Sequence, residues 1–246
     1  MTFRLWPRPR PAARSVLTAY VLNCGADSDA SVMPIDLAAG TAGTPISGAG
    51  IGSSDIVITP DGATAYTTNT GDQAITPIST ATNTSGSSIP FIGDEPYAIA
   101  ITPDGATAYV TDIYLNIVTP VELATRTVGS PIAVGTDPRA IAIPPDGATA
   151  YVTNAGDNTV TPVGLAAAAP RTPIAVGAGP GAIAITPDGA SAYVVNGGDN
   201  TVSPVDLAAG TAGRPIAVGA GPRAIAIAMN PAPMPGCFAI WPFRRD

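Results

Sequence analysis

The sequence contains no histidine and no lysine, and its eleven basic residues are all arginines. Charged residues make up only 12% of its 246 residues, against roughly 25% in an ordinary soluble domain. Without histidine the chain cannot build a Ser-His-Asp triad, use imidazole as a general base or hold a metal through imidazole. We therefore expect no catalytic residues, no metal site and no cofactor.

The few charges are unevenly distributed. Four arginines lie within the first fourteen residues, whereas residues 15–243 hold five arginines and seventeen acidic residues, a net charge of −12. A body this acidic repels phosphate backbones and has no basic stripe. We therefore expect no nucleic acid as a partner, and no insertion into a membrane.

Only two cysteines are present, Cys24 and Cys237, and their pairing cannot be read from the sequence. The N-terminal segment begins with basic residues, but its apolar run from Val16 to Leu22 is short for an export signal. The stretch TAYVLNCG, which contains Tyr20, also matches the later ATAYVTNAG. We expect it to belong to the fold and not to a signal peptide.

One phrase of fourteen residues occurs four times. The copies are IVITPDGATAYTTN from Ile56, IAITPDGATAYVTD from Ile99, IAIPPDGATAYVTN from Ile141 and IAITPDGASAYVVN from Ile183. Their tyrosines, together with Tyr20, are spaced by 46, 43, 42 and 42 residues. Each unit breaks into four short extended pieces without helical periodicity, and four strands per roughly 40–45 residues is the pattern of a propeller blade.

The phrase itself predicts packing and no chemistry. Pro-Asp-Gly is a hairpin turn, and the strand before it puts Ala98 and Ala100 on one face and Ile99 and Ile101 on the other. A small face can then meet a large face on the neighbouring blade. Each third strand carries a proline, which predicts a bulge or a missing ladder bond there. These prolines are Pro34, Pro77, Pro120, Pro162 and Pro204.

These motifs resemble the YVTN family of β-propeller repeats. The resemblance rests on AYVTN at 150–154, AYVVN at 192–196 and AYVTD at 108–112, with PDG before them and GDNTV behind two of them. It covers Ser15 to Met229 and implies a propeller of the kind found in surface-layer and other cell-envelope proteins, hence an extracytoplasmic location. Propellers of this family usually have seven blades, whereas this chain has five tyrosine strands.

We expect an all-β chain with a basic tail at 1–14, one β-propeller of about five four-stranded blades at 15–230, and a proline-rich tail at 231–246. Tyr20 has no strand of the IAITPDG type before it, and the segment from Pro222 to Met229 has no tyrosine strand after it. Pairing of these two segments would close the ring and remove free edges. Alternatively, Phe3 to Trp6 supplies the missing strand, and the chain is an open arc or a fragment.

Candidate site residues lie where the blades differ, in the loops before the inner strands and after the tyrosine strands. The expected channel-mouth set, which would bind an anionic or sugar-like ligand through arginine and aromatic contacts, comprises Tyr97, Arg139, Arg223, Asp94, Glu95 and Asp137. The alternative is that these residues are solvated loop tips.

Two kinds of turn follow the tyrosine strands. Three turns contain Gly-Asp, at Asp72, Asp157 and Asp199. Each offers one carboxylate, too few for calcium, so we expect each aspartate to bond its own tight turn. The remaining turn carries the apolar residues Ile113, Tyr114 and Leu115. If exposed, they form a small contact patch for a partner; if packed inward, they merely replace the usual loop.

These observations favour a non-enzymatic binding or scaffold protein, expected to be a monomer. Its partner would be an unknown protein, a carbohydrate or an anionic ligand at the channel mouth. The alternatives are a propeller hydrolase or lyase that uses the channel-mouth carboxylates, and a non-functional fragment of a larger propeller.

Overall fold

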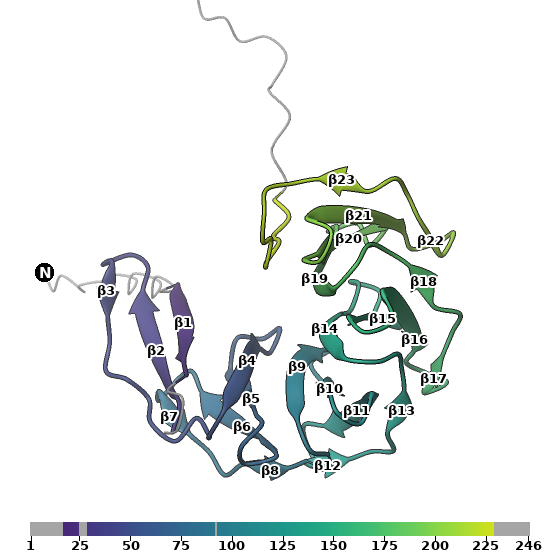
Figure 1. Cartoon of the computed structure of the whole chain (residues 1–246). Coiled ribbons are helices and arrows are strands. Elements are labelled where there is room, and N and C mark those ends of the chain that lie inside the picture. The colour runs from purple at the N-terminus through teal and green to yellow at the C-terminus, as the bar shows by residue number, and fades with distance from the viewer. Residues whose placement is uncertain (1–16, 25–28, 92, 229–246) are drawn as a thin grey trace, which may run out of the picture. The chain divides into compact units, whose positions relative to one another are not determined.

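The structure is a computed structural model that describes residues 17–24, 29–91 and 93–228. All regular elements in these ranges are β-strands (Figure 1). The chain divides into two compact units, Met1–Ala133 and Val134–Asp246. Within the described ranges no helix is long and apolar enough to cross a membrane. The two predicted tails lie outside the described residues.

Four sheets repeat one antiparallel plan of four rows in chain order. The first row consists of β4 (Ser53–Ile58), β9 (Pro96–Ile101), β14 (Pro138–Ala142) and β19 (Pro180–Ile185). The second row holds the tyrosines and consists of β5 (Thr64–Asn69), β10 (Thr107–Asp112), β15 (Thr149–Asn154) and β20 (Ser191–Asn196). The third row holds the prolines and consists of β6 (Ala74–Ser79), β11 (Ile117–Glu122), β16 (Thr159–Gly164) and β21 (Thr201–Asp206).

The fourth row of each sheet is a pair of two-residue strands. These pairs are β7 (Thr84–Ser85) with β8 (Ile89–Pro90), β12 (Thr127–Val128) with β13 (Ile132–Ala133), β17 (Ala169–Pro170) with β18 (Ile174–Ala175), and β22 (Thr211–Ala212) with β23 (Ile216–Ala217). We number the sheets in chain order. The second (β4–β8) and third (β9–β13) lie in the first unit, and the fourth (β14–β18) and fifth (β19–β23) in the second unit.

The first sheet has three rows, β1 (Thr18–Asn23), β2 (Ser31–Asp36) and β3 (Thr41–Ala42). No described first-row strand pairs with β1, and the alternative strand from Phe3 to Trp6 lies outside the described residues. Among the described residues β1 pairs with β2 alone, and Pro222–Ala228 form no strand. Ring closure by these two segments therefore stays a prediction.

The repeated Thr-Pro-Asp-Gly stretch forms the hairpin between the first two rows. In the third sheet the Thr102 hydroxyl donates to Asp104 Oδ1 at 2.6 Å, and the Ala106 N–H donates to the same oxygen at 3.0 Å. Gly105 takes a positive φ of 74°, which glycine adopts without a steric penalty. These hydrogen bonds hold the pKa of Asp104 below its ordinary value, and the bond from the Thr102 hydroxyl has the largest effect. The hairpin confirms the predicted role of the phrase.

The prolines of the third row explain why the fourth row is split. Tyr109 pairs with Pro120 in regular register, without a bulge between the second and third rows. The Pro120 carbonyl accepts a hydrogen bond from the Gly129 N–H of the fourth row at 2.8 Å. The nitrogen of Pro120 therefore faces the same row but cannot donate. The missing bond that the sequence predicts lies here, between the two short strands.

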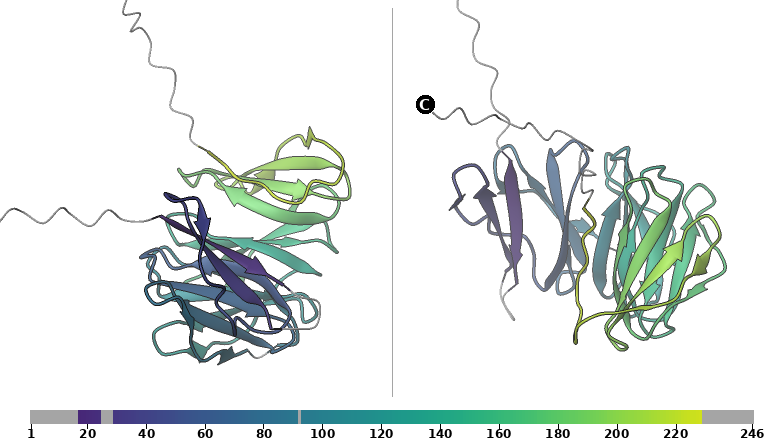
Figure 2. Two further views of the ribbon diagram at one scale, coloured as in Figure 1. Left: turned by 90° about the vertical axis from the view of Figure 1, so that its left-hand side faces the viewer. Right: turned by 90° about the horizontal axis from the view of Figure 1, so that it is seen from above.

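The hydrophobic core lies between successive sheets of a unit, which face one another (Figure 2). Between the second and third sheets, one buried cluster contains Tyr66, Ile75, Ile99 and Ala108. Tyrosine of one sheet and alanine of the next thus share a cluster, whereas Ala98 and Ala100, the predicted small face, are not among its residues and the packing predicted for that face stays a prediction. Similar clusters lie between the first and second sheets and between the fourth and fifth.

Candidate functional site

In every complete sheet, the linker before the first row contacts the turn after the second row. In three of them the glycine N–H of the turn donates to a linker carbonyl at 2.9–3.0 Å. The aspartate of the same turn accepts from the linker residue 21 positions earlier: Asp72 from Ile51 at 2.8 Å, Asp157 from Thr136 at 2.7 Å, and Asp199 from Ala178 at 2.5 Å. The prediction that each aspartate bonds within its own turn is therefore wrong, because its partner is the linker.

The third sheet uses a different residue for this task. Leu115 occupies the position of the turn aspartate, and the fully buried Asp112 at the end of β10 supplies the carboxylate. Asp112 Oδ2 accepts from the N–H groups of Asp94 at 2.8 Å and Glu95 at 3.1 Å. Its Oδ1 accepts from the N–H groups of Tyr114 at 3.0 Å and Leu115 at 2.8 Å. One carboxylate therefore holds both the linker and the turn.

This exchange leaves one trace in the buried structure. The other complete sheets have asparagine at the position of Asp112, and in the second sheet Asn69 Nδ2 donates to the Thr76 hydroxyl at 2.8 Å. The Asp112 carboxylate cannot make this donation, and the corresponding Thr119 hydroxyl is buried and has no hydrogen-bond partner. The linker glycine is common to all four complete sheets: a Cβ at Gly93 would overlap Asp112 Oδ2, just as one at Gly135 would overlap the Asn154 side chain.

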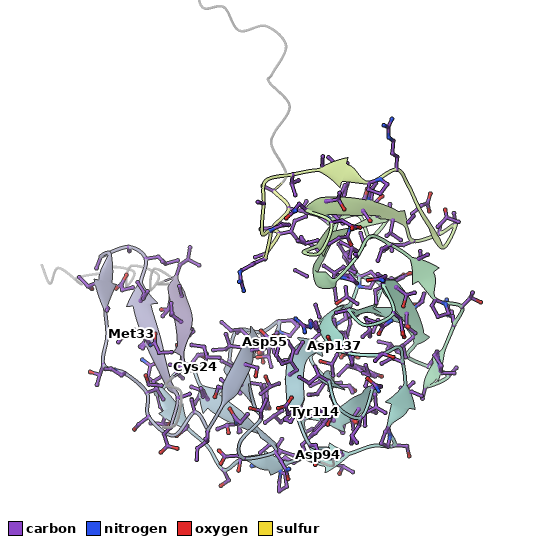
Figure 3. The ribbon with its side chains drawn as sticks, in the orientation of Figure 1. Cys24, Met33, Asp55, Asp94, Tyr114 and Asp137 are labelled. Carbon is purple, nitrogen blue, oxygen red and sulfur yellow. The ribbon has the colours of Figure 1, made fainter. Side chains whose placement is uncertain are left out.

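At position 114, the turn of the third sheet does not bond its linker as the other turns do. In the other complete sheets this position holds a glycine that lies against the linker. A Cβ added at Gly156, for example, would lie 3.0 Å from Thr136. Tyr114 occupies this position, and its N–H bonds Asp112 in place of a linker carbonyl. The result is a hollow of about 510 Å³ lined by Thr70, Gly71, Asp94, Glu95, Tyr114 and Leu115. Figure 3 labels Asp94 and Tyr114, which come from the β8–β9 linker and the β10–β11 turn.

The hollow unites residues that the sequence assigns to two separate sites. Asp94 and Glu95 were expected at the channel mouth, and Tyr114 and Leu115 in a partner patch. Tyr114 is 69% and Leu115 47% exposed, which is the first of the two alternatives for this turn. Ile113, the third residue of the predicted patch, is partly buried and does not line the hollow.

Of the other channel-mouth residues, Tyr97 lies in the first unit and is partly buried. Its carbonyl accepts from the Thr68 hydroxyl of the second sheet at 2.8 Å. In the second unit, Arg139 pairs with Asp137, with 2.9 Å between Nη2 and Oδ2. Arg223 is exposed and lies outside any strand. The Arg139 charge is thus balanced by its neighbour. Binding by these residues stays a prediction.

Asp55 is a candidate that our sequence reasoning missed. It stands on β4 at the position that Ala98, Ala140 and Ala182 occupy on the other first-row strands. Burial raises the pKa of this carboxyl, although hydrogen bonds from the N–H groups of Ile99 and Ile56 act in the opposite direction. An acid in an otherwise alanine position is the signal that could have identified it (Figure 3).

No group of three or more histidine, cysteine or acidic side chains in the described ranges is placed to hold a metal ion. Cys24 is exposed in the first unit and forms no disulfide with another described residue. Cys237 lies outside the described residues, so whether the two cysteines pair stays open.

Comparison with solved structures supports the fold. The chain is similar to hydrazine synthase of Kuenenia stuttgartiensis, with a TM-score of 0.65 and 28% identity over 68% of this chain. It spans 49% of that chain, about half of its length. It is also similar to a functionally unknown protein of Desulfotomaculum acetoxidans, with a TM-score of 0.61 and 22% identity, over 79% of this chain and 68% of that one. No protein-family model and no curated protein matches the sequence. The repeated antiparallel sheets and these neighbours together indicate an all-β chain of the β-propeller type.

Proposed function

We propose that the chain is a non-enzymatic binding β-propeller whose contact surface is the hollow of the third sheet. The observation that carries this proposal is the exposed Tyr114 beside Leu115, at the one complete sheet whose turn departs from the repeat. Exposed aromatic side chains supply large contact area with few rotatable bonds, which is why they are enriched at interfaces.

We also propose a family and a cellular location for the protein. The YVTN-type motifs, AYVTN at 150–154 and its relatives, support membership in that family of repeats. On this basis we place the protein in the cell envelope.

For the ring, we propose that residues 222–228 add to the free edge of β1 as the missing first-row strand. Two features support this. The segment PRAIAIA repeats the Pro-Arg-Ala-Ile-Ala of β14, and within the part of the chain that the structure describes β1 pairs with β2 alone. Thermal unfolding of the intact chain and of a chain that ends at Gly221 tests it: closure predicts a lower Tm for the shorter chain, and equal Tm values contradict closure.

The competing enzymatic proposal uses Asp94 and Glu95 as an acid–base pair. The backbone N–H groups of both residues are already bonded to Asp112, so neither is free to stabilise a developing oxyanion. Binding is therefore the better-supported function.

A combined array and turnover screen tests the proposal. We expect the wild-type protein to bind a subset of peptides or glycans, and Tyr114→Ser to lose that binding. Leu37→Ser is the matched control, because Leu37 is 56% exposed in the same unit but does not line the hollow. Ligands that bind both variants alike would contradict the proposed surface. Turnover that disappears in Asp94→Asn would favour the enzymatic alternative.

A further inference from the structure

We propose that the hollow binds an arginine side chain of a partner peptide, beside an apolar residue of the same peptide. This inference rests on the proposed function and names its ligand class. It differs from the anionic ligand predicted from the sequence.

The hollow has few hydrogen-bond donors to offer. Each of the six lining residues has its backbone N–H committed within the protein: those of Asp94, Glu95, Tyr114 and Leu115 to Asp112, and those of Thr70 and Gly71 to the carbonyls of Gly52 and Ile51. The Thr70 hydroxyl also donates to the Gly52 carbonyl, at 2.9 Å. An anion needs donors, so this lining does not suit one.

The lining is rich in acceptors instead. Asp94 is exposed and Glu95 is partly exposed, and no arginine lies among the six lining residues. The negative charge of the Asp94 and Glu95 carboxylates is complementary to a guanidinium or an ammonium group. The exposed ring of Tyr114 adds a face over which a cation can stack, and Leu115 adds apolar contact.

Arginine fits this combination better than lysine. Its planar guanidinium presents five donors, pairs with carboxylates in a two-pronged manner and stacks on aromatic rings. A volume of about 510 Å³ lies within the usual range for ligand sites, roughly 300–1,000 Å³. It therefore admits the side chain together with a neighbouring apolar residue.

The arginines that favoured an anion do not line this hollow. Arg139 and Arg223 belong to the second unit, and Arg139 is paired with Asp137 at 2.9 Å.

Nuclear magnetic resonance titration tests the inference. The probes are the blocked tripeptides Leu-Arg-Leu, Leu-citrulline-Leu and Leu-Glu-Leu, added to the intact protein. Citrulline keeps the shape of arginine without its charge. We expect shifts of the Asp94, Glu95, Tyr114 and Leu115 signals with the arginine probe, and a weaker response at high salt.

Charge removal supplies the second arm of the test. Asp94→Asn with Glu95→Gln should raise the Kd of the arginine probe about tenfold, because charge-assisted hydrogen bonds are lost. Glu122→Gln removes an acid of the same unit outside the hollow and should leave the Kd unchanged.

Equal shifts with arginine and citrulline, or larger shifts with glutamate, would overturn the cationic ligand while leaving a binding hollow in place. If none of the three probes shifts these signals, the arginine inference falls. The array with Tyr114→Ser then decides the proposed function independently.

Discussion

The carboxylate of Asp55 on β4 accepts a hydrogen bond from the backbone N–H of Ile99 on β9, at 3.1 Å. Its other oxygen accepts from the N–H of Ile56 at 2.8 Å. Asp55 thus ties the first-row strands of the second and third sheets together. The corresponding alanine of the third sheet, Ala98, has no side-chain group that could form such a tie.

The burial of Asp55 predicts a specific pH dependence of stability. Burial raises its pKa, so the folded state holds this proton more tightly than the unfolded state. The resulting stabilisation is present at acid pH and is lost as the pH rises through the raised pKa. The Tm of Asp55→Asn relative to wild type should therefore increase as the pH rises above the ordinary pKa of an aspartate, by about 2–4 °C for each kcal/mol of stability that the wild type loses.

Asp61 is the control with the opposite sign. The Thr59 hydroxyl lowers the pKa of Asp61, so its contribution is present above its ordinary pKa and is lost as the pH falls through the lowered one. Asp61→Asn should lose Tm relative to wild type as the pH rises. If the two variants respond to pH in the same direction, the assignment of Asp55 is wrong.

Loss of the hairpin hydroxyl should weaken the third sheet. In Thr102→Val, the hydrogen bonds from the hydroxyl to Asp104 and from the Thr107 N–H to the hydroxyl disappear. We expect a stability loss of about 1 kcal/mol and a return of the Asp104 pKa toward its ordinary value. Chemical denaturation and carboxyl NMR measure the two effects. An unchanged Asp104 pKa would contradict the role of the hydroxyl.

The stability effect of replacing Asp112 should depend on the residue at position 115. Asp112→Asn leaves one side-chain oxygen for four N–H groups, although its amide can donate to Thr119. We expect a net loss of about 1–2 kcal/mol. The double variant Asp112→Asn with Leu115→Asp restores the pattern of Asn154 and Asp157, and should recover most of that loss.

A denaturation cycle over these variants measures the coupling of the two positions. Additive effects, without recovery in the double variant, would show that Asp112 does not replace the turn aspartate.

The fold was largely predictable because each blade repeats the same local chemistry. The tyrosine strands and the Pro-Asp-Gly hairpins follow from alternation and spacing. The split of the fourth row opposite Pro120 was only partly predictable: the missing donor is visible in the sequence, but not where the chain accommodates it.

The site was predictable by position and not by chemistry. Departure from the repeat pointed to Tyr114 and Leu115, and the loop position to Asp94 and Glu95. That they line one hollow depends on Asp112, whose change from asparagine looks conservative in the sequence. The carboxylate of Asp112 acts through N–H groups that lie 17 and 18 residues earlier in the chain. Local sequence patterns do not show that these residues are close in space. Asp55 was missed because it lies inside a strand.

We propose that binding resides where the repeat is broken, so restoring the repeat sequence should greatly weaken it. Residues 112–116, DIYLN, would be replaced by NAGDN, the sequence of 154–158. The measurement compares the affinity of the restored and wild-type chains for the array ligands and for the arginine probe, after both are shown to unfold cooperatively. We predict that the restored chain keeps its stability and loses binding by about tenfold or more. Undiminished binding by the restored chain would contradict the account.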